Sequence, residues 1–273
     1  MINWIKRNQI VTFSILAYLY SWIIWSPLVL SAKGIIDTYV PPWIHLIGSW
    51  GPLLAAFTVT VIVGKGAGFR ELIRRLFRWK VGLRWFLVAT SPIILFLIAL
   101  SIDILISNTS FDFNLFGRLQ EISGVVGVAG WVVMILTFGF GEETGWRGFA
   151  LPRLQITRSA SKATLILIPI WIFWHLPLFF YKESFIEMGV FGAFGWAISL
   201  AFGAVVLTWL YNSSKSSILI VAIWHGTFNA AVASGEGNVS MITSVLVILW
   251  AIIIQRLTGT ENLSKSKKQI IIC

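Results

Sequence analysis

Eight apolar segments run along this chain, and each is close to the length of a helix that crosses a lipid bilayer. A spanning helix needs about 20 apolar residues, since the hydrocarbon layer is about 30 Å thick. The segments comprise residues 10–32, 43–63, 84–106, 124–151, 163–181, 189–211, 216–234 and 239–256. Because lipid offers no hydrogen bonds to the backbone, such segments form helices. They predict an all-α polytopic membrane protein with about eight transmembrane helices.

The composition agrees with a chain that faces lipid over most of its length. Hydrophobic residues make up 57% of the 273 positions and charged residues only 12%, against about 25% in a typical soluble domain. No internal repeat and no separate soluble region interrupts the pattern, so we expect residues 1–273 to form a single integral membrane domain. The single cysteine, Cys273, excludes a disulfide or a cysteine-based metal cluster within one chain.

The positive charges indicate how the chain is oriented. With eight spans, alternate loops lie on the same side of the membrane, and only Lys33, Arg118 and Lys182 of the 21 Lys and Arg residues fall on the less basic side. Cytoplasmic loops carry the excess of Lys and Arg. The distribution therefore predicts a cell-membrane protein whose termini both lie in the cytoplasm. It also explains the net charge of +10 as a topology signal and not as a surface for nucleic acid.

The basic connector at residues 69–80 has the pattern of a helix on the membrane surface. The apolar face of that helix would carry Phe69, Leu72, Ile73, Leu76 and Phe77, and its other face is basic. Amphipathic helices of this kind lie in the headgroup layer and are attracted to anionic lipids. The connector therefore predicts one cytoplasmic-surface helix, with membrane lipids and not nucleic acid as its partners.

Glu142, Glu143 and Arg147 stand inside the fourth predicted span. At the bilayer centre a charged side chain costs at least about 2.5–3.5 kcal/mol. Glu143 and Arg147 are four residues apart and share a helix face, in the order that favours pairing. Glu142 is rotated by about 100° from Glu143, so it can face a pocket and act as a general base. The alternative is that both Glu residues only end the helix at the cytoplasmic surface.

Two further apolar spans contain a histidine. His175 interrupts the fifth span, and His225 in the seventh lies one helical turn before Asn229, on the same face. His175 alone could be a hydrogen-bonded core residue, and His225 with Asn229 could form interhelical hydrogen bonds worth about 0.6 kcal/mol each. Measured from the cytoplasmic ends of their spans, however, Glu142, His175 and His225 all lie about 14–20 Å deep. The common depth predicts one shared polar site that opens to the cytoplasm.

Together the three stretches resemble the motifs of the CPBP family, which includes the type II CAAX prenyl endopeptidases and the bacterial Abi proteins. The motifs read Glu142-Glu143-x-x-x-Arg147, Trp171-x-x-x-His175 and His225-x-x-x-Asn229, within a core of roughly residues 120–235. The stretch at 51–56 resembles the second-helix signature of the same family. Trp171 stands where the family more commonly has Phe.

This resemblance implies an intramembrane endopeptidase, a hydrolase that acts on a membrane-associated peptide or protein. A CAAX-type prenylated peptide and a bacteriocin-like or other peptide precursor are both candidate substrates. The roles that the resemblance implies are activation of water by Glu142 and His175, stabilisation of the oxyanion by His225 and Asn229, and support by Glu143 and Arg147.

The family has also been described as metalloproteases. Glu142, His175 and His225 could supply three ligands to a divalent metal such as zinc, with water in the fourth position. The sequence lacks the HExxH pattern of many zinc proteases. We favour direct activation of water by the glutamate, with the metal as the alternative.

Two other functions stay open at this point. A catalytically idle protein that binds a peptide or confers bacteriocin immunity would use the same fold and the same polar residues. A proton-coupled transporter would use buried Glu and His as a relay. The transporter predicts two matching halves with broken helices, and no such repeat is present in the sequence.

Overall fold

The computed structural model describes residues 2–107, 111–112, 115–235 and 238–271, which are helical and contain no β-strand. Cys273 lies outside these residues. Six helical stretches are long and apolar enough to cross a membrane: Gln9–Ala32, Ile44–Gly64, Leu83–Ser107, Ala160–Tyr181, Gly189–Ser213 and Val239–Thr258. The prediction of an all-α membrane protein is confirmed, whereas the number of eight spans is not.

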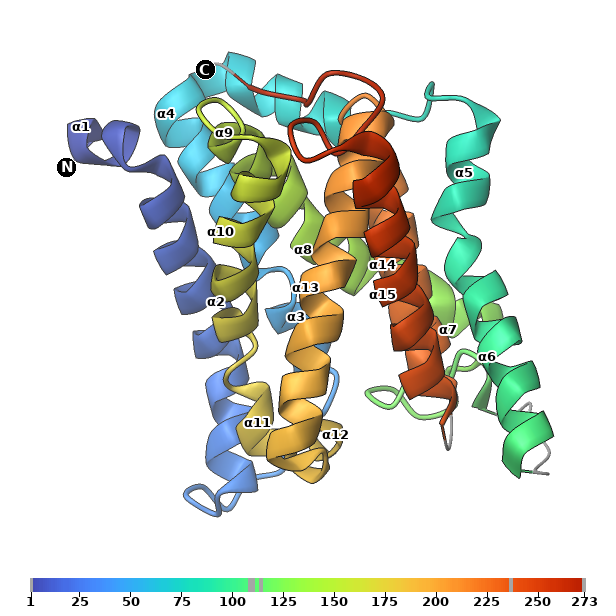
Figure 1. The fold of residues 1–273 in the computed structure, drawn as a ribbon. Coiled ribbons are helices and arrows are strands. Elements are labelled where there is room, and N and C mark those ends of the chain that lie inside the picture. The colour runs from blue at the N-terminus through green and yellow to red at the C-terminus, as the bar shows by residue number, and fades with distance from the viewer. Residues whose placement is uncertain (1, 108–110, 113–114, 236–237, 272–273) are drawn as a thin grey trace.

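The helices follow one another as an antiparallel bundle (Figure 1). In chain order they are α1 (Ile2–Arg7), α2 (Gln9–Ala32), α3 (Ile44–Gly48), α4 (Gly51–Leu76), α5 (Leu83–Ala89), α6 (Ser91–Ser107), α7 (Gly127–Met134), η2 (Ile135–Gly139), α8 (Phe140–Gly145), η3 (Trp146–Ala150), α9 (Leu151–Leu154), α10 (Ala160–Trp174), α11 (Leu178–Tyr181), α12 (Glu183–Glu187), α13 (Gly189–Ser213), α14 (Ile218–Ala233) and α15 (Val239–Thr258).

The two predicted spans that fall short carry five of the six candidate site residues, all except His175. The segment predicted at 124–151 is a helical run divided by two π-helical turns, η2 and η3. Turns of this kind are rare and are frequently found at functional sites. The span predicted at 216–234 is the 16-residue helix α14, which is about 24 Å long and therefore shorter than a bilayer core.

Three predicted spans are also broken within their length. The chain interrupts the span at 43–63 between α3 and α4, the span at 84–106 at Thr90, and the span at 163–181 after Trp174. Prolines stand just after all three breaks, at Pro52, Pro92 and Pro177. Proline removes one backbone hydrogen bond but is tolerated in the first turn of a helix, so it marks where the next segment begins.

The surface connector is built differently from its prediction. It continues α4 without a break to Leu76, and the cyan end of this helix runs across the top of the bundle in Figure 1. Leu72 and Leu76 are buried against protein, and so is Arg75, whose guanidinium donates to the Gly148 carbonyl (2.8 Å) and the Tyr211 hydroxyl (2.7 Å). The predicted amphipathic helix is therefore the last part of α4. Arg70 and Arg74 remain exposed on its basic face, whereas the bundle buries Arg75 and covers part of the apolar face.

Glycines let the motif-bearing helices approach one another closely. A Cβ atom on Gly139 of η2 would lie 2.3 Å from the Ala222 carbonyl oxygen, and one on Gly226 of α14 would lie 2.4 Å from Ile135 Cα. On the other side of α8, a Cβ on Gly145 would lie 2.5 Å from Pro52. Small residues at such crossings are typical of helix packing in membranes. They hold the α8 segment between α4 and α14.

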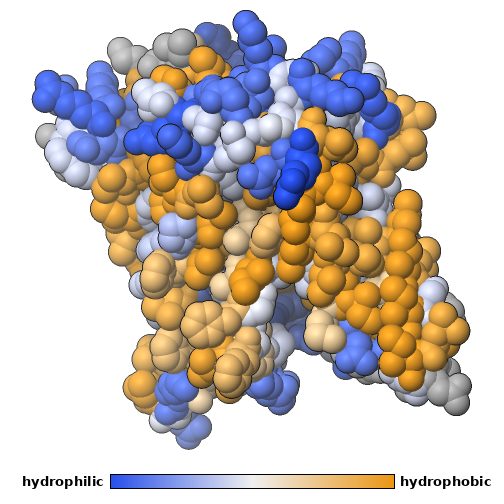
Figure 2. Space-filling model, in the orientation of Figure 1, coloured by the Kyte–Doolittle hydropathy of each residue, from blue (hydrophilic) through white to orange (hydrophobic). Residues whose placement is uncertain are grey.

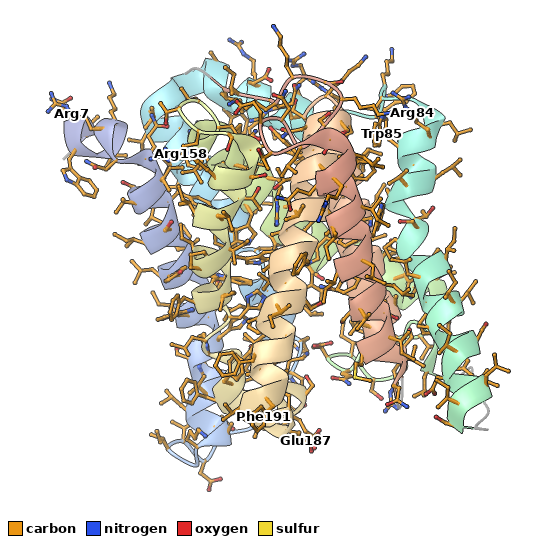
Figure 3. The ribbon with its side chains drawn as sticks, in the orientation of Figure 1. Arg7, Arg84, Trp85, Arg158, Glu187 and Phe191 are labelled. Carbon is orange, nitrogen blue, oxygen red and sulfur yellow. The ribbon has the colours of Figure 1, made fainter. Side chains whose placement is uncertain are left out.

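Charged groups gather at one end of the bundle. Figure 2 shows a hydrophilic cap above a broad apolar belt, and Figure 3 labels Arg7, Arg84 and Arg158 at the capped end, with Glu187 and Phe191 at the other. Helix α1 and the segment after α15 both lie at the capped end (Figure 1). At the opposite end, Figure 2 shows this face of the molecule hollowed between its two sides.

Candidate active site

The six predicted site residues come from three neighbouring parts of the bundle. Glu142 and Glu143 lie on α8, Arg147 on η3, His175 directly after α10, and His225 with Asn229 on α14. Glu142, Glu143, Arg147 and His225 have exposed fractions of 3%, 0%, 0% and 6%, while His175 and Asn229 are partly exposed. Four buried polar groups on packed helices need partners within the protein.

Glu143 is the residue that joins two of these helices. Its Oε1 atom accepts hydrogen bonds from Arg147 Nη1 (2.8 Å) and from His225 Nδ1 (2.8 Å). The contact between Glu143 and Arg147 is the one that their four-residue spacing predicts. The bond to His225 was not predicted, and it connects α8 to α14. Since a carboxylate only accepts, His225 carries a hydrogen on Nδ1. Its Nε2 atom takes no part in this bond.

Trp171 connects Glu142 to the rest of the site. Its indole Nε1 donates to Glu142 Oε2 at 2.8 Å. The face of the same ring lies 4.3 Å from the Arg147 guanidinium, a favourable cation–π contact. The ring also meets His225 edge-on, with 5.5 Å between the centroids. One tryptophan thus fixes the direction of Glu142 and separates it from Arg147, which is paired with Glu143.

His175 is held by its own helix and enclosed by aromatic rings. Its Nδ1 atom lies 2.8 Å from the Trp171 carbonyl oxygen. Because a carbonyl oxygen only accepts, Nδ1 carries the hydrogen and Nε2 of the neutral ring has a lone pair available for a proton. The rings of Trp174, Trp196 and Phe185 lie 4.8, 5.1 and 6.4 Å from the imidazole. The arrangement suits a base in a largely apolar surrounding.

The structure brings together five of the six residues through contacts and places Asn229 beside them. His225 meets the Trp171 ring edge-on, and Trp171 bonds to both Glu142 and His175. Asn229 lies one turn beyond His225 on the same face of α14 and makes no hydrogen bond to another described residue. Its amide is therefore free to bind a ligand.

The metal hypothesis can be tested against the arrangement of the side chains that could bind a metal. Within the described part of the chain, no three His, Cys, Asp or Glu side chains are grouped so that they could hold a metal ion. The predicted trio of Glu142, His175 and His225 is not gathered into such a group. The hydrogen bonds at Nδ1 leave Nε2 of each histidine unengaged, as in histidines that bind metals, so the metal stays the alternative prediction.

The chain has one more histidine, His45, which the motifs did not indicate. Its Nδ1 lies 2.6 Å from the Tyr181 hydroxyl, and its ring stacks on Trp25 at 5.6 Å. Trp25 in turn lies 4.8 Å from Trp174, which contacts His175. All three histidines are thus connected through aromatic rings. No spacing rule could have found this contact, because His45 and Tyr181 are 136 residues apart.

Comparison with known proteins points to the same family as the motifs. Residues 124–231 match the family model described as Type II CAAX prenyl endopeptidase Rce1-like, a range that contains all six predicted site residues. The part of the chain that carries the motifs is therefore similar to this family. CAAX prenyl protease 2 of Methanococcus maripaludis is 28% identical over 189 residues, which cover 65% of this chain and 68% of that protein. The resemblance read from the motifs is confirmed, and the chain is an intramembrane endopeptidase, a hydrolase of a peptide or protein substrate in the membrane.

The hydrogen bond from Trp171 to Glu142 can be removed by a conservative substitution. Trp171→Phe keeps a ring against Arg147 and His225 but removes the N–H that orients Glu142. A hydrogen bond to a charged group is worth about 1.5–3 kcal/mol, so we expect kcat for peptide cleavage to fall about tenfold with little change in KM.

Trp224→Phe is the matched control. The Trp224 Nε1 atom is buried without a hydrogen-bond partner in the described structure, so this change removes an indole N–H and no hydrogen bond. Steady-state kinetics on both purified variants in detergent would make the comparison. An equal loss of kcat in the two variants would contradict the role given to Trp171.

Proposed function

We propose that Glu142 and His175 activate a water molecule for attack on the scissile peptide bond. The observation that carries the proposal is the link through Trp171, whose indole donates to Glu142 and whose carbonyl engages Nδ1 of His175, so that Nε2 of His175 is left available. The water oxygen forms a bond to the carbonyl carbon, and its proton passes to the Glu142 carboxylate. The same proton then goes to the leaving nitrogen as the C–N bond breaks, which returns Glu142 to its starting state.

The remaining residues are proposed to stabilise and to position. His225, protonated on both nitrogens, would donate from Nε2 to the oxyanion, and the free Asn229 amide would supply a second donor. The carboxylate of Glu143 holds the His225 ring in place, because it accepts from His225 Nδ1. Arg147 balances the charge of Glu143. In this proposal Glu143 positions His225 and does not contact the substrate.

The proposed substrate is a lipidated C-terminal peptide of the CAAX type. The relative from Methanococcus maripaludis is named a CAAX prenyl protease, and a prenyl chain would dissolve in the lipid that the apolar belt of Figure 2 faces. A bacteriocin-like or other peptide precursor is the competing substrate. No feature of the site favours an idle binding protein or a proton-coupled transporter.

We also propose that the basic face lies in the cytoplasm, following the excess of Lys and Arg there. The termini then lie on the same side. His225 is seven residues into α14, about 10 Å from that face, which favours substrate access from the cytoplasm. The hollow at the opposite end (Figure 2) is the competing route.

The test is cleavage of synthetic peptides by the purified protein in liposomes. We expect a prenylated CAAX peptide to be cut and the same peptide without its prenyl group to be cut at least about tenfold more slowly, since burying an apolar chain contributes about 0.8 kcal/mol per CH₂. Equal rates would contradict the lipidated substrate.

A chelation arm tests the metal alternative on the same preparation. We expect cleavage to survive a strong chelator, and metal analysis to find well under one equivalent of zinc per chain. Loss of activity on chelation, with recovery on adding zinc, would favour the metal hypothesis and contradict direct activation of water by Glu142.

A further inference from the structure

A cavity of about 730 Å³ lies on the basic face, where α10 begins, and shares no residue with the candidate active site. Arg158 and Lys162 line it from α10 and the turn before that helix, and Glu261 lines it from the segment after α15. Arg158 is labelled at the capped end of the bundle in Figure 3. The cavity therefore stands at the level where the apolar belt meets the hydrophilic cap.

The charge in this cavity is positive. Arg158 and Lys162 have no acidic partner among the described residues, and Arg158 donates only to the Thr157 hydroxyl at 3.0 Å. Glu261 is balanced by Lys268, whose Nζ lies 2.6 Å from the carboxylate and also donates to the Arg158 carbonyl at 2.8 Å. Two cations thus remain uncompensated, and their natural complement is an anion.

Part of the cavity wall is apolar and lies within a candidate membrane span. Leu165 and Ile166 line it and are 65% and 37% exposed. Both lie within the candidate span Ala160–Tyr181, one turn of α10 beyond Lys162. A ligand that fills the cavity would meet cations at one end and lipid-facing side chains at the other.

We propose that this cavity binds the headgroup of an anionic phospholipid. The phosphate pairs with Arg158 and Lys162, the hydroxyls of Thr157 and Thr260 supply further hydrogen bonds, and the acyl chains run down over Leu165 and Ile166. A free phosphate ion has the same charge but would make no use of the apolar wall. This site is independent of the proposed catalytic roles.

Native mass spectrometry of the full chain in detergent tests the proposal, with phosphatidylglycerol and phosphatidylcholine of identical chains as probes. We expect phosphatidylglycerol to be retained in preference, and the variant Arg158→Gln/Lys162→Gln to lose that preference. The expected loss is about fivefold in affinity for each cation removed. The matched control, Lys265→Gln/Lys267→Gln, removes the same charge from exposed positions of the same face that do not line the cavity.

Two outcomes would overturn the proposal. An equal loss in the two double variants would mean that the whole basic face attracts anionic lipid without a defined site. Displacement of the lipid by inorganic phosphate at millimolar concentration, with no effect of Leu165→Ser, would mean that the cavity binds a free anion. The expected result is that Leu165→Ser weakens lipid retention severalfold and that inorganic phosphate does not compete.

Discussion

Replacing Glu142 by glutamine is expected to abolish peptide cleavage while the protein still folds. The amide has the shape of the carboxylate, and its oxygen can still accept the hydrogen bond from Trp171. It cannot take a proton from water, so the general-base step is lost. General acid–base catalysis contributes about 10²–10⁴-fold, and we expect a loss of about 10³-fold in kcat.

The measurement is single-turnover cleavage of a prenylated peptide, with thermal unfolding in detergent to confirm that Glu142→Gln is folded. Glu187→Gln is the control, since this exposed carboxylate lies at the far end of the bundle from the basic cap (Figure 3) and its loss should leave kcat unchanged. Cleavage within a few-fold of wild type by Glu142→Gln would remove Glu142 from the reaction, and a catalytically idle binding protein would then explain the fold better.

Local pattern was sufficient to predict six membrane helices and the resemblance to the family. Hydropathy alone predicts where lipid-facing helices lie, because a helix satisfies its own backbone within each segment. The six spans found by length and composition all match predicted ones. The spacing of Glu143 and Arg147 also predicts their contact, since residues four positions apart are neighbours on one face of a helix.

Contacts between distant segments were not accessible to that reasoning. The bond from Trp171 to Glu142 and the bond from His225 to Glu143 depend on how three helices are rotated against one another. That rotation is set by close backbone approaches at glycines such as Gly139 and Gly226. A lone glycine in an apolar helix gives no sign of which neighbour it will meet.

The prediction for the surface connector at residues 69–80 was incomplete for a related reason. Its periodicity predicts an apolar face correctly, but it cannot say whether lipid or protein covers that face. In the structure Leu72 and Leu76 pack inward and carry Arg75 with them to the Gly148 carbonyl. Arg75, which was counted as a topology signal, thus forms a contact with η3, the π-helical turn that contains Arg147.

Arg147→Met is expected to destabilise the protein by about 3–5 kcal/mol, the usual effect of removing one partner from a buried ion pair. Arg147 and Glu143 are both 0% exposed and 2.8 Å apart, so the change leaves a carboxylate in the interior with only His225 to accept from. Adding Glu143→Gln should recover most of the loss, because the amide oxygen still accepts from His225 Nδ1 and the unpaired charge of Glu143 is gone. The single and double variants together form a thermodynamic cycle for unfolding in detergent.

Arg74→Met is the matched control for this cycle. Arg74 also pairs with a glutamate on its own helix, Glu71, at 2.7 Å, but its side chain is 66% exposed, and such surface pairs contribute about 0–1 kcal/mol. If Arg147→Met were no more destabilising than Arg74→Met, water would have to reach the Glu143 carboxylate. The buried network would then not be rigid enough to hold His225 for catalysis. A large effect that Glu143→Gln reverses would instead show that the charge of Arg147 balances that of Glu143 beside His225.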